Sequence, residues 1–103
     1  MAHYLFKQGA SVPLAPGPVE DDMLAAVTGS GVAHVEVTYR PPCDDAGWQG
    51  KLRAALDDAG VNINSVHAPF GSPVDISSED AAVRATGAAA VEASISYAAA
   101  IGA

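Results

Sequence analysis

The sequence predicts an α/β protein with a parallel sheet, and two observations predict this class. A short apolar run, a loop and a helical pattern that stops near a glycine recur three times along the 103 residues. The apolar runs are about the length of a strand, whereas each helical pattern is longer than about ten residues. Strands that alternate with helices in this order form parallel sheets through right-handed crossovers.

The first unit is expected to contain a strand at about 3–8 and a helix at about 18–29. Aromatic side chains in the sequence HYLFK are typical of a strand. The segment 9–18 contains three prolines and is predicted to be a loop. Pro18 suits a first helical position, and the acidic residues that follow it favour a helix N-terminus.

The second unit has the clearest strand, at about 33–39, because its side chains alternate between apolar and polar. One face would carry Val35, Val37 and Tyr39, and the other would carry His34, Glu36 and Thr38. A helix is expected at about 47–59, with apolar residues at three- and four-residue spacing and Gly60 as its stop.

The third unit is predicted to combine a strand at about 61–67 with a long alanine-rich helix at about 78–101. Ser77 or Ser78 is expected to cap the start of this helix, and Gly102 its end. The heavier residues of this helix are expected at Val83, Val91, Ile95 and Ala98 or Ala99.

Charge and composition exclude several classes of function. The chain has 12 acidic and 5 scattered basic residues, so we expect no nucleic-acid partner. No apolar stretch approaches the roughly 20 residues that span a membrane, and no targeting segment is recognisable. The lone Cys43 fits a reducing compartment, so a cytoplasmic location is expected. No G-x-G-x-x-G follows any predicted strand, which disfavours a dinucleotide-binding fold.

Glu36 and His67 are the candidate site residues, because ligands of parallel α/β folds bind at the carboxyl ends of the strands. Glu36 lies within a valine-rich strand and must face solvent, a cavity or a cation, since burying an unpaired carboxylate is costly. His67 lies where the third strand gives way to a loop, and can bind a metal or transfer a proton. The alternatives are a simply solvated strand face for Glu36 and a structural role for His67.

The segments GVAHVEV (31–37) and VNINSVHAPF (61–70), with 52–60, 75–78 and 98–103, resemble the xylose isomerase-like TIM-barrel superfamily. That superfamily includes sugar (phosphate) isomerases and epimerases and the endonuclease IV type of abasic-site nuclease. The resemblance implies that residues 1–103 are the N-terminal (βα)3 portion of a (β/α)8 barrel. Since such barrels usually need about 250 residues, the chain is expected to be a fragment.

The resemblance also implies what the site would bind. It implies a divalent metal (Mn, Zn, Mg or Co) in the full-length parent, with catalytic residues beyond Ala103. His67 would contact substrate in the isomerase branch and would be a metal ligand only in the nuclease-like branch. Glu36 matches an acidic position common at the end of the second strand, and from its place in the strand we expect it to contact substrate with His67.

We therefore expect part of a metal-dependent enzyme of carbohydrate metabolism that isomerises or epimerises a sugar or polyol by proton transfer next to a carbonyl. The fragment itself is expected to be inactive. The alternatives are a non-catalytic truncated product or oligomerising half-barrel, with a second copy of the chain as a possible partner, and, less favoured, an abasic-site nuclease.

Overall fold

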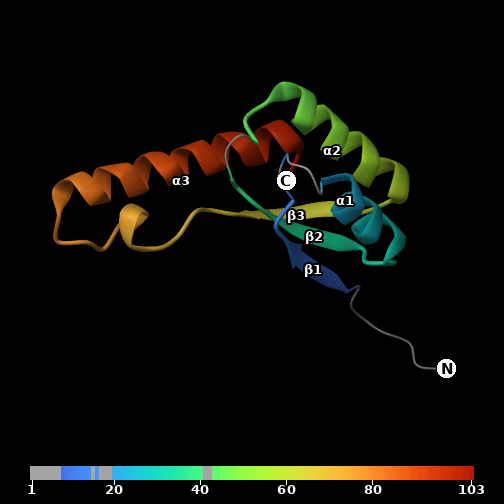
Figure 1. Ribbon diagram of the computed structural model, residues 1–103, viewed down its shortest axis with the longest axis horizontal. Coiled ribbons are helices and arrows are strands. Elements are labelled where there is room, and N and C mark those ends of the chain that lie inside the picture. The colour runs from blue at the N-terminus through green and yellow to red at the C-terminus, as the bar shows by residue number, and fades with distance from the viewer. Residues whose placement is uncertain (1–7, 15, 17–19, 41–42) are drawn as a thin grey trace.

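The computed structural model describes residues 8–14, 16, 20–40 and 43–103. Three parallel strands pair in the order β1–β2–β3, and three helices lie along one side of this sheet (Figure 1). The elements in chain order are β1 (Gly9–Val12), α1 (Glu20–Gly29), β2 (His34–Thr38), α2 (Ala46–Ala59), β3 (Asn62–His67), the short 3-10 helix η1 (Ser72–Val74) and α3 (Ala81–Ile101). The predicted α/β class with parallel strands is confirmed.

The first strand lies later in the chain than the sequence predicts. It occupies Gly9–Val12, inside the segment predicted to be a loop. Residues 3–7 of the predicted strand lie outside the described residues. Pairing with β2 fixes this strand, since Gly9 stands opposite His34 and Val12 opposite Val37. A Cβ at Gly9 would lie 3.1 Å from the His34 carbonyl oxygen, so glycine permits this close approach.

The first helix is described from Glu20 to Gly29, so the predicted start at Pro18 falls outside the described residues. Met23, Leu24 and Val27 face the core, as their spacing predicts. The chain then turns through Gly31, whose φ of 82° lies in the left-handed region.

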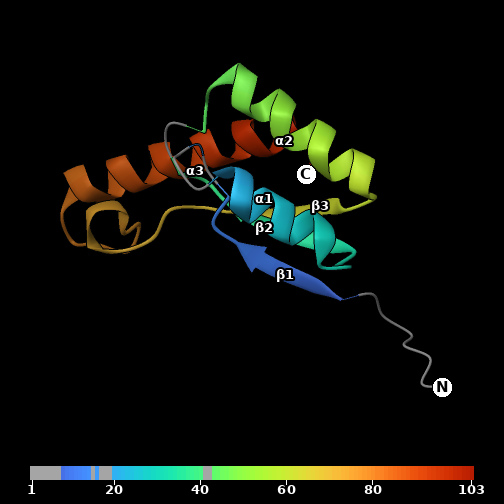
Figure 2. The same cartoon turned by 45° about the vertical axis from the view of Figure 1, so that its right-hand side comes forward.

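The core lies between the sheet and the helices (Figure 2). Alternation in β2 buries Val35 and Val37 completely on the helix side, as predicted. Helix α2 presents Trp48, Leu52 and Leu56 to the same layer. The Asp45 carboxylate accepts the Trp48 backbone N–H at 2.8 Å and caps the start of α2.

Helix α3 begins three residues later than predicted, and neither serine is its cap. Asp80 is the N-cap, and its Oδ1 accepts the Ala82 N–H at 2.8 Å. Ser78 instead accepts the Asp80 N–H at 3.1 Å, so it supports the turn before the cap. The end at Gly102 is confirmed, with the left-handed φ of 76° expected of a glycine C-cap.

The buried face of α3 does not follow its larger apolar side chains. The buried positions are Gly87, Ser94, Tyr97 and Ile101. Val91 is 37% exposed and Ile95 is 65% exposed, although both are among the larger apolar residues of the helix. The η1 loop covers the side of α3 that carries Gly87, where an added Cβ would lie 2.3 Å from the Val74 carbonyl oxygen. Only glycine lets the helix pass this close to the loop.

Among the described residues, no helix has the length and apolar character needed to cross a membrane.

Candidate functional site

The open face of the sheet, opposite the helices, carries the candidate site. Because successive side chains of a strand point to opposite faces, burial of Val35 and Val37 against the helices places Glu36 on the open face. A shallow hollow of about 300 Å³ lies here. It is lined by residues of all three strands: Gly9, Ala10, Ser11, His34, Val35, Glu36, Asn64 and Ser65.

Glu36 is held by serines from both neighbouring strands. Ser11 of β1 donates its hydroxyl to Oε1 at 2.9 Å, and Ser65 of β3 donates to Oε2 at 3.0 Å. The Ser11 hydrogen bond, followed by that of Ser65 and the charge of His67, lowers the pKa of Glu36, while desolvation opposes the shift. Glu36 is therefore an ionised carboxylate at neutral pH with a fixed orientation.

Sheet register makes this arrangement possible. Ser11 and Ser65 are both direct partners of Glu36 in the parallel ladders. An irregularity in β3 between the partners of Val35 and Glu36 brings Ser65, rather than Asn64, opposite the carboxylate.

His67 ends β3 on the same open face, two residues after Ser65, and is exposed. Its Nδ1 donates to the Ala68 carbonyl oxygen at 2.7 Å. In neutral imidazole this leaves Nε2 with the lone pair, available as an acceptor or metal ligand. The ring also packs at 5.1 Å, measured between centroids, against Phe70, whose side chain is 80% exposed.

The structure thus places both predicted residues on one face, with His67 influencing the ionisation of Glu36. They do not share the hollow, whose lining includes Glu36 and excludes His67. Within the part of the chain that the structure describes, no three His, Cys, Asp or Glu side chains converge as a metal site would require. These residues alone therefore do not fit a complete cation site.

Ser11 is the site residue that the sequence analysis missed. It lies in the Gly9–Val12 segment that was predicted to be a loop, so its alignment with Glu36 could not be anticipated. Ser65, by contrast, follows from the predicted third strand.

Tyr39 lies at the carboxyl end of β2 but faces the helices. Its hydroxyl donates to Asp44 at 2.8 Å, and its ring meets Tyr97 edge-on at 5.7 Å. The hydrogen bond to Asp44, with burial and the Asp44 charge, raises the pKa of Tyr39 to about 12. Cys43 is buried nearby, and burial is the main cause that raises its pKa. Both residues belong to the core.

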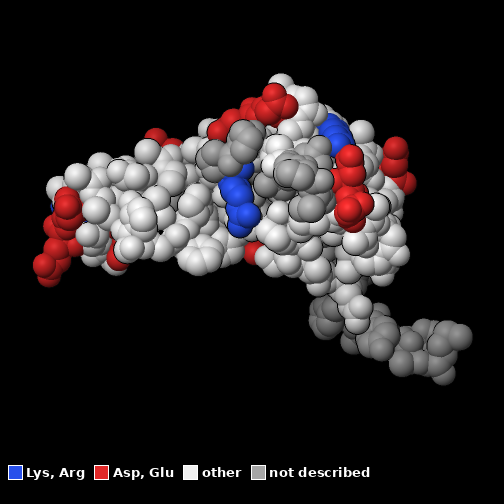
Figure 3. Space-filling view, viewed as in Figure 1, with Lys and Arg blue, Asp and Glu red and all other residues white. Residues whose placement is uncertain are grey.

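The charge distribution agrees with the sequence. In the space-filling view of Figure 3, basic side chains occur as separate spots among carboxylates and form no stripe on the face shown.

Comparison with protein-family models and with curated proteins finds no match. Among solved structures, the chain is similar to the crystal structure of a D-psicose 3-epimerase determined in the presence of D-fructose. The TM-score is 0.72 at 24% sequence identity, and the match covers 93% of this chain. The chain spans about a third of the epimerase, 34% of its length. This similarity establishes the fold as a partial TIM barrel with an open sheet.

Proposed function

We propose that residues 1–103 are the first three βα units of a metal-dependent sugar isomerase or epimerase of the xylose isomerase-like superfamily, in which Glu36 and His67 contact the sugar. One observation carries the proposal: an oriented, ionised carboxylate lies on the open face of a sheet whose fold is similar to part of a D-psicose 3-epimerase. In a TIM barrel this face points to the interior, and ligands bind at its carboxyl-terminal mouth.

Glu36 suits recognition of a sugar hydroxyl. Each carboxylate oxygen accepts one serine hydroxyl and retains a further lone pair. A hydroxyl donated by the sugar would form a charge-assisted hydrogen bond, which is about twice as strong as a neutral one. The two serines already fix the carboxylate, so binding costs little side-chain entropy.

His67 would contribute a second contact to the sugar, nearer the carboxyl-terminal mouth of the barrel. Its Nδ1 is engaged by the Ala68 carbonyl, so Nε2 is the atom offered to a sugar oxygen. The exposed ring of Phe70 beside it offers an apolar surface for the C–H face of a sugar.

The proposed metal dependence belongs to the parent enzyme. A divalent cation such as Mn²⁺, Mg²⁺, Co²⁺ or Zn²⁺ would polarise the substrate's carbonyl and hydroxyl oxygens when bound. The described residues form no complete ligand set, so further ligands and the groups that move the proton would come from outside them. The 103-residue chain alone is therefore expected to bind metal weakly and to turn over no ketose. Measurable isomerase activity of the purified chain would contradict this expectation.

Nuclear magnetic resonance titration of the chain with D-fructose tests the sugar contacts. We expect shift changes at Ser11, Glu36, Ser65 and His67, and their loss in Glu36→Gln, which keeps the shape but removes the charge. Glu92→Gln, an exposed substitution on α3, is the matched control and should retain them. The proposal is wrong if D-fructose leaves the open face unperturbed, or if Glu36→Gln responds like the wild type.

A further inference from the structure

The rings of His67 and Phe70 form a paired contact at the carboxyl end of β3. Their centroids lie 5.1 Å apart, with 60° between the ring planes, which is a tilted arrangement that aromatic pairs favour. Both side chains are exposed, so the contact is not a consequence of core packing.

The local sequence HAPFG builds this contact. Nδ1 of His67 donates to the Ala68 carbonyl oxygen at 2.7 Å, and Pro69 favours an extended backbone at Ala68. Gly71 then turns the chain with a φ of 109°, which residues with a side chain rarely adopt. A Cβ at Gly71 would meet no atom of a non-adjacent residue closer than 3.9 Å, so the turn, and not packing, requires a glycine here. The backbone is therefore constrained on both sides of Phe70.

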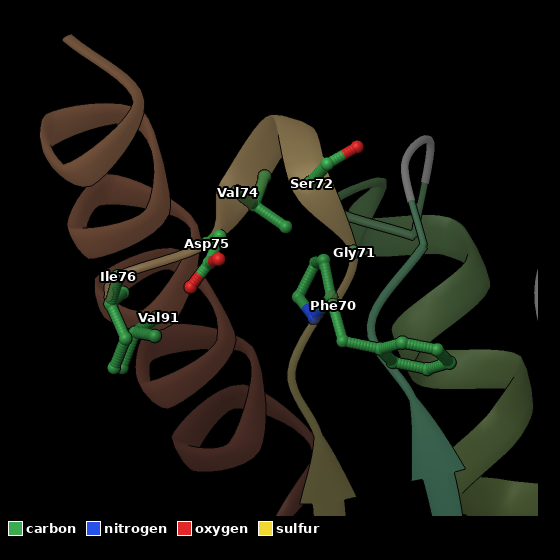
Figure 4. Close-up of a pocket in the computed structure, with 8 residues that line it drawn as sticks. Phe70, Gly71, Ser72, Val74, Asp75, Ile76 and Val91 are labelled. Atoms are coloured by element: carbon green, nitrogen blue, oxygen red, sulfur yellow. The ribbon is translucent and has the colours of Figure 1, made fainter. Parts of the chain in front are cut away.

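The two rings lie at the ends of strands that pair with each other. His67 stands opposite Thr38 in the β2–β3 ladder. Figure 4 shows the Phe70 ring extending toward the end of β2, away from Ile76 and Val91. The contact therefore lies on the β2 side of β3, and a further strand at the outer edge of β3 would not replace it.

The contact with Phe70 bears on which nitrogen of His67 is available to a ligand. A neutral histidine carries its proton on the nitrogen that donates a hydrogen bond, so the bond to Ala68 leaves the Nε2 lone pair free. Water competes for this bond because the imidazole is exposed, and an unrestrained side chain would also exchange rotamers. The phenyl ring limits both the rotation of the imidazole and the access of water on the side that it covers.

We propose that Phe70 is a positioning residue, which holds the His67 imidazole in the Nδ1–H tautomer and so keeps the Nε2 lone pair available to a sugar hydroxyl. The inference rests on the proposed function for its ligand, whereas the tautomer of His67 can be measured in the chain without any ligand.

Long-range nitrogen–proton NMR spectra distinguish the two neutral tautomers of His67. The wild type should hold mainly the Nδ1–H form, and Phe70→Ala should lower its ratio to the Nε2–H form by about two- to tenfold, the strength of one aromatic contact. Phe70→Tyr keeps the ring and should restore the wild-type ratio. Ile76→Ala is the matched control, because it removes an exposed apolar side chain from the same loop and leaves the ring contact with His67 in place. The tautomer of His34 in β2 should stay the same in every variant, which separates a local release of His67 from a general loss of structure.

Titration of the same proteins with D-fructose connects this role to the proposed sugar site. The sugar concentration at half-response should rise about two- to tenfold in Phe70→Ala and stay near the wild-type value in Phe70→Tyr. Equal tautomer ratios in the wild type and Phe70→Ala, or an equal change in Ile76→Ala, overturn the positioning role. A tautomer change in Phe70→Ala without any response of the wild type to D-fructose would instead contradict the proposed function and leave the positioning of His67 standing.

Discussion

The two faces of the sheet differ in the side chains that the same strand presents to them. In β2, Val35 and Val37 have no exposed surface and pack beneath the helices, whereas Glu36 between them faces the open side. Substitutions on the covered face remove buried contacts, whereas those on the open face remove only partly solvated hydrogen bonds. The covered face therefore determines stability, and the open face is left to carry polar groups that can bind a ligand.

The largest expected loss of stability comes from a substitution on the covered face. Leu52 of α2 is completely buried, so Leu52→Ala should lower the free energy of unfolding by about 2–5 kcal/mol. On the open face, Ser65→Ala removes one hydrogen bond and should cost only about 0.5–1.5 kcal/mol. Urea denaturation of both variants compares the faces directly, and equal losses would remove the distinction between them.

The packing of α3 against the η1 loop can be tested with two glycines. Gly87→Ala should destabilise the chain by about 1–3 kcal/mol, because its Cβ would collide with the Val74 backbone. Gly50→Ala lies in α2 with no atom within 4 Å of the added Cβ, and should stabilise by about 0.5–1 kcal/mol. Thermal unfolding of the pair checks the opposite signs. Stabilisation by Gly87→Ala would show that the helix and loop do not make this contact.

A smaller effect is expected from Tyr39 at the border of the core. Tyr39→Phe removes the hydrogen bond to Asp44 and should cost about 0.5–1.5 kcal/mol at neutral pH. The raised pKa of Tyr39 means that the wild type loses stability as the pH rises from 10 toward about 12, since the unfolded chain releases the phenol proton first. Tyr39→Phe should lack this alkaline loss. Urea midpoints across this pH range would contradict the assignment if both proteins lost stability equally.

The sequence predicted those elements of the fold that follow from a local pattern of apolar and polar residues. Alternation in β2 and the apolar spacing of α2 each reflect burial of one face, so both elements lie where expected. The first strand was missed because Gly9, Ala10 and Ser11 are weak or ordinary strand formers, and pairing with β2 determines their conformation.

Helix α3 shows a second limit of prediction from the sequence. Its many alanines give a weak pattern, and its larger residues Val91 and Ile95 do not mark the buried face. The η1 loop packs against Gly87, and Val91 and Ile95 remain exposed. No periodicity in the helix could reveal which side a distant loop would cover.

The candidate site was also predicted only in part. Glu36 and His67 could be singled out as candidates because each is a polar residue toward the carboxyl end of a predicted strand. The hydroxyls that hold Glu36 could not both be identified, because the register of β1 against β2 depends on tertiary pairing.

The smallest change in stability is expected from Glu36→Gln. Because folding lowers the pKa of Glu36, the ionised carboxylate adds stability above its ordinary pKa of 4.5, and this contribution disappears as the pH falls through the lower folded value. The wild type should therefore lose more stability than Glu36→Gln below that pH. Acid-dependent urea midpoints that are parallel for the two proteins would contradict this.

The ionisation of Glu36 itself tests the central claim, that the open face holds a carboxylate oriented and kept charged by two serines. The side-chain carboxyl resonance of Glu36 can be followed with pH in the wild type, Ser11→Ala and Ser65→Ala. We predict a wild-type midpoint below 4.5, raised in both variants and more in Ser11→Ala, whose hydrogen bond is the larger cause of the shift. A wild-type midpoint at or above 4.5, or one that neither variant changes, would contradict the account.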